Sequence, residues 1–386
     1  VLDGSLKKRE KNSFSDISQN ELLSNIGKTP EELEDLDRNK ATDVVSNALG
    51  EKLREMMKNE EISGTIGIGG GVGSGVAMGA FNHLPTSFPK MLVTTVENIV
   101  RNYLAGNVTL LPSVVDFIGS ERLNTLEKKV LNSAAAAISS QTNEFNKINI
   151  ENGIFATQMG TTTKCVGQCR KILEKEGFEI NSFHAAGPGG ECYEELIRKD
   201  VASGALDITI AELANALVGG EVACKVDRLT GEIEKELPTV ICPGNGETIV
   251  FSGPGTENVP TKFKDREFYQ HNPSTTLMRL NAKESEKLGE VMAKRVNGAN
   301  GPVRIIFPEK GWSEYDREGK IETMDYSGEK TGKEWFKPDV NRVFLNSLRE
   351  NTNKRNENIE IITVENNIND EKFSEIICKE FLEIYE

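Results

Sequence analysis

A glycine-rich segment, GIGGGVGSG, directly follows an apolar stretch near the start of the chain. Where glycines join a strand to a helix, backbone N–H groups can approach a phosphate closely, and the helix N-terminus adds a partial positive charge. The spacing meets neither the strict GxGxxG motif nor the Walker motif with its lysine. Close packing of the glycines is the alternative explanation. We predict an anion-binding turn formed by Gly69, Gly70, Gly71, Gly73 and Ser74.

A threonine-rich segment, MGTTTKC, marks a second strand-to-helix junction. Thr162 and Thr163 offer hydroxyl and N–H groups at the expected helix start, which suits a phosphate or a carboxylate. Ordinary capping of the helix by a threonine explains the same residues equally well.

A third junction, FHAAGPGGECYEE, combines a histidine, three glycines and a carboxylate. In open α/β sheets, ligands bind at the carboxyl ends of the strands, where Gly187, Gly189 and Gly190 are expected. His184 and Glu194 are therefore weak candidates for acid–base catalysis. A histidine at a strand end is also often structural.

Other polar segments carry weaker signals. The segment TVICPGNGE is expected to be an ordinary glycine turn, and HNPSTTLMR could supply a polar contact. Cys165 and Cys169 have a spacing that could hold a metal, but no second pair or histidine cluster accompanies them. We expect small core residues there and no metal site.

The elements that would position these residues alternate between strands and helices. An amphipathic helix is expected over Ala41–Lys58, and both halves of the chain follow a strand–helix pattern that implies parallel sheets covered on both faces. Expected strands include Gly64–Gly71, Pro89–Val96, Val108–Leu111, Gly153–Met159, Phe178–His184, Thr239–Cys242, Val303–Phe307 and Ile359–Val364.

The polar stretch Gln141–Asn152 is the best candidate for a linker between two domains. We predict an N-terminal α/β domain over 1–150, a C-terminal Rossmann-like α/β domain over 151–386, and a ligand cleft between them. The asparagine-rich and lysine-rich region Asn341–Asn369 is expected to be solvated surface.

Charge and length exclude several classes of function. The 386 residues carry 46 basic and 60 acidic side chains, a net charge of −14. This balance argues against direct nucleic-acid binding and against binding to an anionic membrane, although a local site for one small anion remains allowed. The chain has no 18-residue apolar run and no signal-peptide pattern, and its six scattered cysteines suit a reduced, cytoplasmic compartment.

Several blocks occur together in one order: IGGGVGS, LPTSFPKMLVTTV, VLNSAAAAI, MGTTTKCV, HAAGPGGECYE, HNPSTTLMR and PEKGWS. In this order they resemble the Tm-one-like ATP-binding domain family, which includes the inhibitor domain of a tomato tobamovirus-resistance protein and bacterial and fungal relatives. The resemblance covers nearly the whole chain. It implies two Rossmann-like domains, bound ATP, possible magnesium, and a tendency to form homodimers.

The resemblance also implies which residues would contact the nucleotide. The glycine-rich turn of the family corresponds to Gly69–Ser74, and its Ser-Thr block corresponds to Thr94 and Thr95. Its two later blocks correspond to the threonine-rich segment and the GPGG segment described above. The chain departs from the family at Glu97, where a carboxylate near phosphates would weaken an anion site. The family's opening strand is also expected to be missing before Val1.

Three functions remain open at this point. The leading hypothesis is a nucleotide-binding protein that holds the phosphates of ATP. The second is an enzyme acting on a small phosphorylated or carboxylated metabolite, with His184 and Glu194 as the acid–base pair and Arg228 or Arg279 binding the anion. The third is a module that binds a protein partner.

Overall fold

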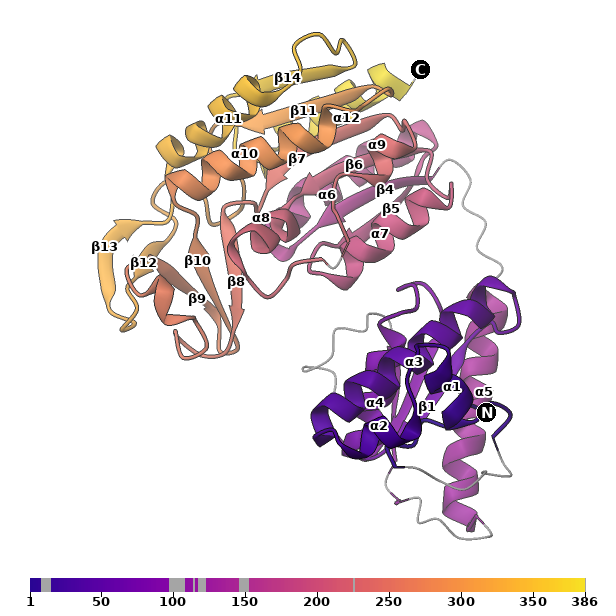
Figure 1. The fold of residues 1–386 in the computed structure, drawn as a ribbon. Coiled ribbons are helices and arrows are strands. Elements are labelled where there is room, and N and C mark those ends of the chain that lie inside the picture. The colour runs from indigo at the N-terminus through magenta and orange to yellow at the C-terminus, as the bar shows by residue number, and fades with distance from the viewer. Residues whose placement is uncertain are drawn as a thin grey trace. The chain divides into compact units, whose positions relative to one another are not determined.

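The computed structural model describes residues 1–7, 15–96, 108–113, 115–116, 123–145, 153–224 and 226–385. The chain divides into two compact units, Val1–Ile148 (unit 1) and Asn149–Glu386 (unit 2), which are described separately (Figure 1). Both units contain a parallel sheet covered by helices, which confirms the predicted two-domain α/β fold. None of the described helices is long and apolar enough to cross a lipid bilayer.

Unit 1 is built on a parallel sheet with the order β1-β2-β3. The middle strand is buried along its whole length because strands flank it and helices cover both faces. The strands are β1 (Thr65–Gly69), β2 (Lys90–Thr94) and β3 (Val108–Pro112), and the helices are α1 (Gln19–Ser24), α2 (Pro30–Glu34), α3 (Arg38–Lys58), α4 (Gly71–Phe81) and α5 (Thr125–Phe145). One face packs against α4, which is covered in turn by α3 with α1 and α2 beside it, and the other face packs against α5.

The helices of unit 1 start in different ways. Thr29 and Glu32 form a capping box at α2, and the Asp37 carboxylate accepts N–H bonds at the start of α3. Helix α4 begins after Gly70, which has no side chain to cap it. Its first N–H groups therefore have neither an intrahelical acceptor nor a side-chain cap.

Unit 2 contains a doubly wound parallel sheet with the order β14-β11-β7-β6-β4-β5. The chain runs from β4 outward to β5 and then returns to β6 on the other side of β4, so the switch point lies between β4 and β6. The strands are β4 (Gly153–Gln158), β5 (Glu179–His184), β6 (Gly204–Thr209), β7 (Thr239–Gly244), β11 (Val303–Pro308) and β14 (Ile359–Val364).

Helices cover both faces of this sheet. On one face, α6 (Thr163–Leu173) and α12 (Glu371–Tyr385) pack against alternate apolar residues of the strands. The opposite face carries α7 (Pro188–Arg198), α8 (Ala211–Val218), α9 (Gly231–Glu234), α10 (Ala282–Val296) and α11 (Pro338–Asn351). Three short 3-10 helices complete the helical elements: η2 (Gly160–Thr162), η3 (Glu174–Glu176) and η4 (Thr261–Phe263).

A second, antiparallel sheet in unit 2 was not predicted. It has the order β13-β12-β9-β10-β8 and is inserted after β7 and after β11 (Figure 1). The segment HNPSTTLMR, interpreted as a polar contact, spans the tight turn of its β9–β10 hairpin. The strands are β8 (Thr248–Ser252), β9 (Phe268–Asn272), β10 (Thr275–Arg279), β12 (Glu322–Met324) and β13 (Lys330–Glu334).

Two local predictions need correction. The division between the units, at Ile148 and Asn149, falls within the predicted linker Gln141–Asn152, but its first residues belong to α5, which continues to Phe145. Residues 146–152 lie outside the described part of the chain. The region 341–369 is not all solvated surface, because Asn341, Asn367 and Asn369 are buried and hydrogen-bonded. The polar composition did not indicate exposure in this region, because these asparagines form hydrogen bonds with buried backbone and side-chain groups at the carboxyl edge of the sheet.

The crossing of α10 and α11 gives a test of the fold. A Cβ at Gly289 would lie 2.6 Å from the backbone oxygen of Phe344, so Gly289→Ala should push the helices apart and lower the free energy of unfolding by about 1–3 kcal/mol. Gly167→Ala on α6, where a Cβ meets nothing within 4 Å, should leave stability unchanged or raise it by up to about 1 kcal/mol. Urea unfolding followed by tryptophan fluorescence reports on unit 2, which contains both tryptophans. Equal stability of the two variants would contradict the close packing.

Candidate functional site

The carboxyl edge of the sheet in unit 1 carries a cavity of about 420 Å³ beside the start of α4. Its walls come from the ends of β1 and β2 and from the segment after β3. Thr95 and Asp116 are exposed at this site, and Ile68 and Val93 provide apolar surface. The lining residues are Ile68, Gly69, Gly70, Val93, Thr95, Ser113 and Asp116.

Ser74 and Thr94 hold the glycine turn from inside. Both side chains are buried, and their hydroxyl oxygens lie 2.6 Å apart. The Ser74 hydroxyl also donates to the Gly69 carbonyl oxygen at 2.9 Å, and the Thr94 hydroxyl accepts from the Val96 N–H at 3.0 Å. Ser74 is therefore not the helix cap, and both residues position the turn against β2.

The glycines of this turn differ in what the fold requires of them. A Cβ at Gly69 would lie 2.7 Å from the Gly73 backbone, so packing alone demands glycine there. A Cβ at Gly71 would meet nothing within 4 Å, and at Gly70 and Gly73 the nearest atoms are at 3.6 and 3.5 Å. These three positions could carry side chains in the structure as it stands. Their glycines leave the start of α4 accessible at the backbone.

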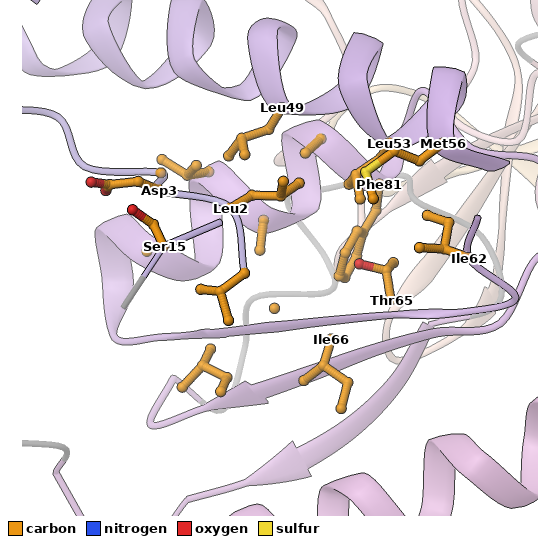
Figure 2. Close-up of a pocket in the computed structure, with 18 of the residues that line it drawn as sticks. Leu2, Asp3, Ser15, Leu49, Leu53, Met56, Ile62, Thr65, Ile66 and Phe81 are labelled. Carbon is orange, nitrogen blue, oxygen red and sulfur yellow. The ribbon is translucent and has the colours of Figure 1, made fainter. Parts of the chain in front are cut away.

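An apolar groove of about 790 Å³ lies on the other side of β1, between this strand and helices α3 and α4 (Figure 2). Leu49, Leu53 and Phe81 point into it from the helices, and Ile66 contributes from the strand. Asp3 is the lining residue with a charged side chain. The groove therefore suits apolar groups and not a phosphate.

The glycine turn of unit 2 is closed, in contrast to the turn of unit 1. Gly187 has a φ of +90°, which favours glycine, and a Cβ at Gly189 would lie 1.9 Å from the His184 carbonyl oxygen. A Cβ at Gly190 would lie 2.0 Å from a carboxylate oxygen of Glu212. The fold itself explains these three glycines.

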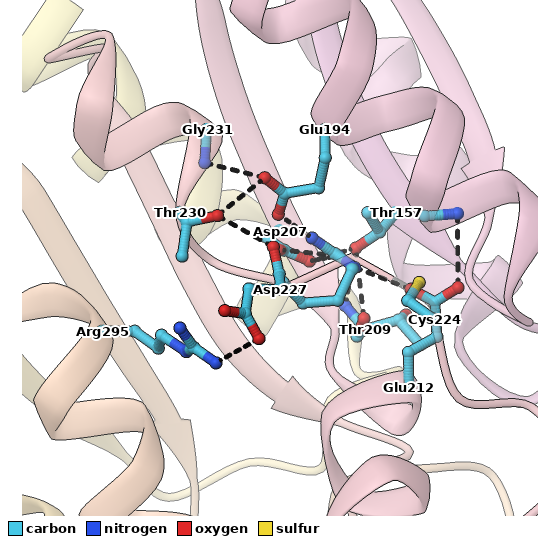
Figure 3. A network of polar contacts seen from close by, with 12 residues as sticks. Thr157, Glu194, Asp207, Thr209, Glu212, Cys224, Asp227, Thr230, Gly231 and Arg295 are labelled. Carbon is cyan, nitrogen blue, oxygen red and sulfur yellow. Dashed lines mark hydrogen bonds and ion pairs between the residues drawn. The ribbon is translucent and has the colours of Figure 1, made fainter. Parts of the chain in front are cut away.

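Glu212 occupies the position where a phosphate was predicted. Its Oε1 accepts N–H bonds from Gly187 at 2.5 Å and from Gly190 at 3.2 Å. Its Oε2 accepts from Arg228 Nε at 2.7 Å (Figure 3). The side chain is 1% exposed.

Arg228 is enclosed by carboxylates and does not face a ligand. Besides Glu212, its guanidinium donates to Glu194 at 2.8 Å and to both oxygens of Asp207 at 2.9 Å (Figure 3). Glu194 also accepts from the Gly231 N–H at 2.7 Å. Arg228, predicted to bind a substrate anion, instead joins α7, β6 and α8 within the protein.

Negative charge exceeds positive charge in this cluster. Glu232 is fully buried, and neither of its oxygens has a hydrogen-bond partner among the described residues. Burial, reinforced by Glu194 and Asp207, raises the pKa of Glu232 well above its ordinary value. Burial also raises the pKa of Glu212, although Arg228 opposes that shift. Burial among carboxylates thus favours the protonated, uncharged form of the Glu232 carboxyl group.

The switch point between β4 and β6 is filled by hydroxyl groups. The Thr162 hydroxyl lies 2.8 Å from that of Thr209, and the Thr163 hydroxyl donates to the Met159 carbonyl oxygen. Thr157 donates to Asp207 at 2.6 Å and links the two strands. The Thr162 side chain makes no capping hydrogen bond to α6, and the hydroxyls of Thr162 and Thr163 are used in contacts within the protein.

The structure does not bring His184 and Glu194 together as a pair. His184 is exposed at the end of β5, whereas Glu194 is fully buried against Arg228 and Gly231. Arg279 is also buried and donates to Asp316 at 3.1 Å and to Asn341 at 2.8 Å. Of the predicted set, Gly69, Gly70 and Thr95 line the cavity beside α4, and Gly73 lines the apolar groove.

Sequence reasoning missed a second buried carboxylate cluster at the carboxyl edge of β7 and β11. Glu247 accepts a short hydrogen bond from the Ser313 hydroxyl, and its other oxygen has no described partner. Burial, with Asp316 nearby, raises the pKa of Glu247 to about 7. Glu247 follows the PGNG turn directly, and that position at a strand end was the available signal.

The cysteines behave as core residues. Cys165 and Cys169 are fully buried among apolar side chains of the α6 and α12 face, and all six cysteines are free thiols. In the described part of the chain, no group of three or more His, Cys, Asp or Glu residues is arranged to hold a metal ion.

Fold and site together define a two-unit α/β protein with an open glycine turn in unit 1 and a closed one in unit 2. The domain models of the uncharacterised protein family UPF0261 match this chain over residues 1–147 (N-terminal domain) and 152–385 (C-terminal domain). The chain belongs to this family.

Relatives come from bacteria and from tomato. A UPF0261 protein of Clostridium tetani is 33% identical over 354 residues, covering 91% of this chain and 83% of the relative. The ToMV resistance protein Tm-1(GCR237) of Solanum lycopersicum is 32% identical over 402 residues, covering 100% of this chain and 50% of its own length. The ToMV susceptible protein tm-1(GCR26) is similar to the same extent, at 31% identity. The chain thus spans half the length of these tomato relatives.

Glu247 makes the stability of unit 2 depend on pH. Its pKa is raised from 4.5 to about 7, so the folded state binds the proton more tightly than the unfolded chain. The contribution of Glu247 to the free energy of unfolding is fully present below about pH 4.5 and is lost as the pH rises to about 7. The free energy of unfolding therefore falls by about 3 kcal/mol over this range. Glu247→Gln should remove this slope while still accepting from Ser313, whereas Glu257→Gln, at an exposed position, should keep it. Urea unfolding at several pH values between about 4.5 and 7, followed by tryptophan fluorescence, measures how the free energy of unfolding depends on pH. The same pH dependence in the unaltered protein, Glu247→Gln and Glu257→Gln would contradict the raised pKa of Glu247.

Proposed function

We propose that unit 1 binds the phosphates of a nucleotide, ATP in the first instance, at the start of α4. The first N–H groups of α4 and the hydroxyl of Thr95 would contact phosphate oxygens at the cavity lined by Gly69 and Gly70. An uncapped helix start at the carboxyl edge of a parallel sheet is a common phosphate site.

The observation that carries this proposal is the unused space at Gly70 and Gly71, at the start of α4. The fold leaves room for a side chain at each position, yet each is glycine. A phosphate at the helix start would need that room, because a Cβ would separate it from the N–H groups. Glycines required only for packing, such as Gly69, show a close contact instead.

Asp116 suggests that magnesium accompanies the nucleotide. Its exposed carboxylate lines the same cavity as the glycine turn and would repel a phosphate on its own. A Mg²⁺ ion bound to the phosphates would reverse this interaction, since the ion prefers carboxylate and phosphate oxygens. We therefore expect the magnesium complex to bind more tightly than the free nucleotide. Glu97, which could add to this repulsion, lies outside the described residues.

Calorimetric titration of the full chain with ATP, with and without Mg²⁺, tests the proposal. Gly71→Ala should weaken ATP binding at least about tenfold, equivalent to about 1.4 kcal/mol, because the new methyl group covers the helix start. The same change should leave unit 1 as stable as before, since it meets nothing within 4 Å.

Gly167→Ala is the matched control, because it adds the same methyl group to an open helical position in unit 2. It should bind ATP like the unaltered protein. Circular dichroism during thermal unfolding checks that both variants are folded. The absence of binding heat from the unaltered protein, or equal affinity in Gly71→Ala, would refute the proposed site.

A further inference from the structure

The start of α7 in unit 2 has the donors of an oxyanion site. Two backbone N–H groups, from Gly187 and Gly190, converge on one carboxylate oxygen of Glu212. Arg228 Nε donates to the other oxygen at 2.7 Å. Two N–H groups and a guanidinium around one oxyanion form the arrangement by which proteins bind carboxylates and phosphates.

The turn is shaped around this carboxylate. Only glycine fits at position 190, because a Cβ would lie 2.0 Å from Glu212 Oε2 and 2.5 Å from Oε1. The carboxylate comes from the first turn of α8, so the contact joins two helices that are separated in the sequence by β6. Its side chain is almost completely shielded from solvent.

Electrostatics do not favour a further negative charge at this place. Arg228 is already paired with Asp207 and Glu194, and the buried Glu232 lies in the same cluster. The cation that Glu212 contacts is therefore neutralised by other groups. The two directed N–H groups must supply much of what holds Glu212 in place.

We propose that the α7 turn is an oxyanion site that the protein fills with its own Glu212 carboxylate, locking α8 onto α7. An external oxyanion, of which a small carboxylate is the closest match, can occupy the turn only after the Glu212 side chain has left. This inference is independent of the nucleotide site proposed for unit 1.

Removing the internal carboxylate tests the proposal. Glu212→Ala should lower the thermal unfolding midpoint of unit 2, because it leaves two buried N–H groups and Arg228 Nε without an acceptor. Sodium formate should raise the unfolding midpoint of this variant most of the way back to that of the unaltered protein, and the effect should saturate with formate concentration. Sodium chloride at the same ionic strength should not raise it. Tryptophan fluorescence reports the transition of unit 2. Equal effects of formate and chloride would overturn the proposal.

A second substitution distinguishes this site from general anion binding. In Glu212→Ala/Gly190→Ala, the added methyl group would occupy the place of the carboxylate, so formate should no longer raise the midpoint. Glu284→Ala removes the carboxylate partner of Arg266, which donates to it at 2.7 Å without the glycine turn, and formate should not restore its stability. A rise in the unfolding midpoint of either variant on addition of formate would overturn the proposal.

Failure of Glu212→Ala to fold in chloride does not remove the test. The comparison is then the yield of folded protein after refolding in formate and in chloride. A yield that depends on formate supports the oxyanion site. No folded protein in either salt would overturn it, because an external carboxylate would then have failed to replace Glu212.

Discussion

The polar interior of unit 2 depends on the guanidinium of Arg228. It is fully enclosed and donates to three carboxylates that come from α7, β6 and α8. Loss of the guanidinium would leave these carboxylates buried without their cation, a change that costs about 3–5 kcal/mol for a single broken pair. The same guanidinium also donates to Glu212, whose other oxygen accepts from the N–H groups of the glycine turn, so this carboxylate connects the turn to the charged interior.

The two glycine turns show that one sequence pattern can produce opposite structures. Both begin a helix at the carboxyl end of a parallel strand, but the N–H groups of the turn in unit 2 are bonded to the buried Glu212. In unit 2 each glycine is explained by a positive φ, a carbonyl oxygen or a carboxylate close to the Cβ position. In unit 1 three glycines have no such neighbour. The space around each glycine, more than the number of glycines, separates a turn that is open to a ligand from one that is packed.

Much of the fold followed from the sequence, because apolar runs between glycine turns are a strong local signal. The parallel strands other than β6, and the helix α3, were predicted within a few residues of their observed bounds. The strand β6 (Gly204–Thr209) was not identified from the sequence. The antiparallel sheet was not predicted, since its short strands mix charged and apolar residues and β13 is mostly polar. The partners of Arg228, Glu194 and Glu247 were also beyond prediction, because they join residues 16 to 66 positions apart in the sequence. Local patterns located the turns but could not show which of them a side chain fills.

The outer strand of the antiparallel sheet also determines how copies of this chain can meet. Among the described strands, β13 (sequence KTGKE) pairs with β12 alone, so it lies at the edge of this sheet. Lys330 and Lys333 are exposed there, and Gly332 has a φ of +70° that interrupts the regular pleat. Lysines and irregular backbone at a sheet edge oppose the addition of a strand from another molecule. This edge is therefore protected against strand-to-strand aggregation.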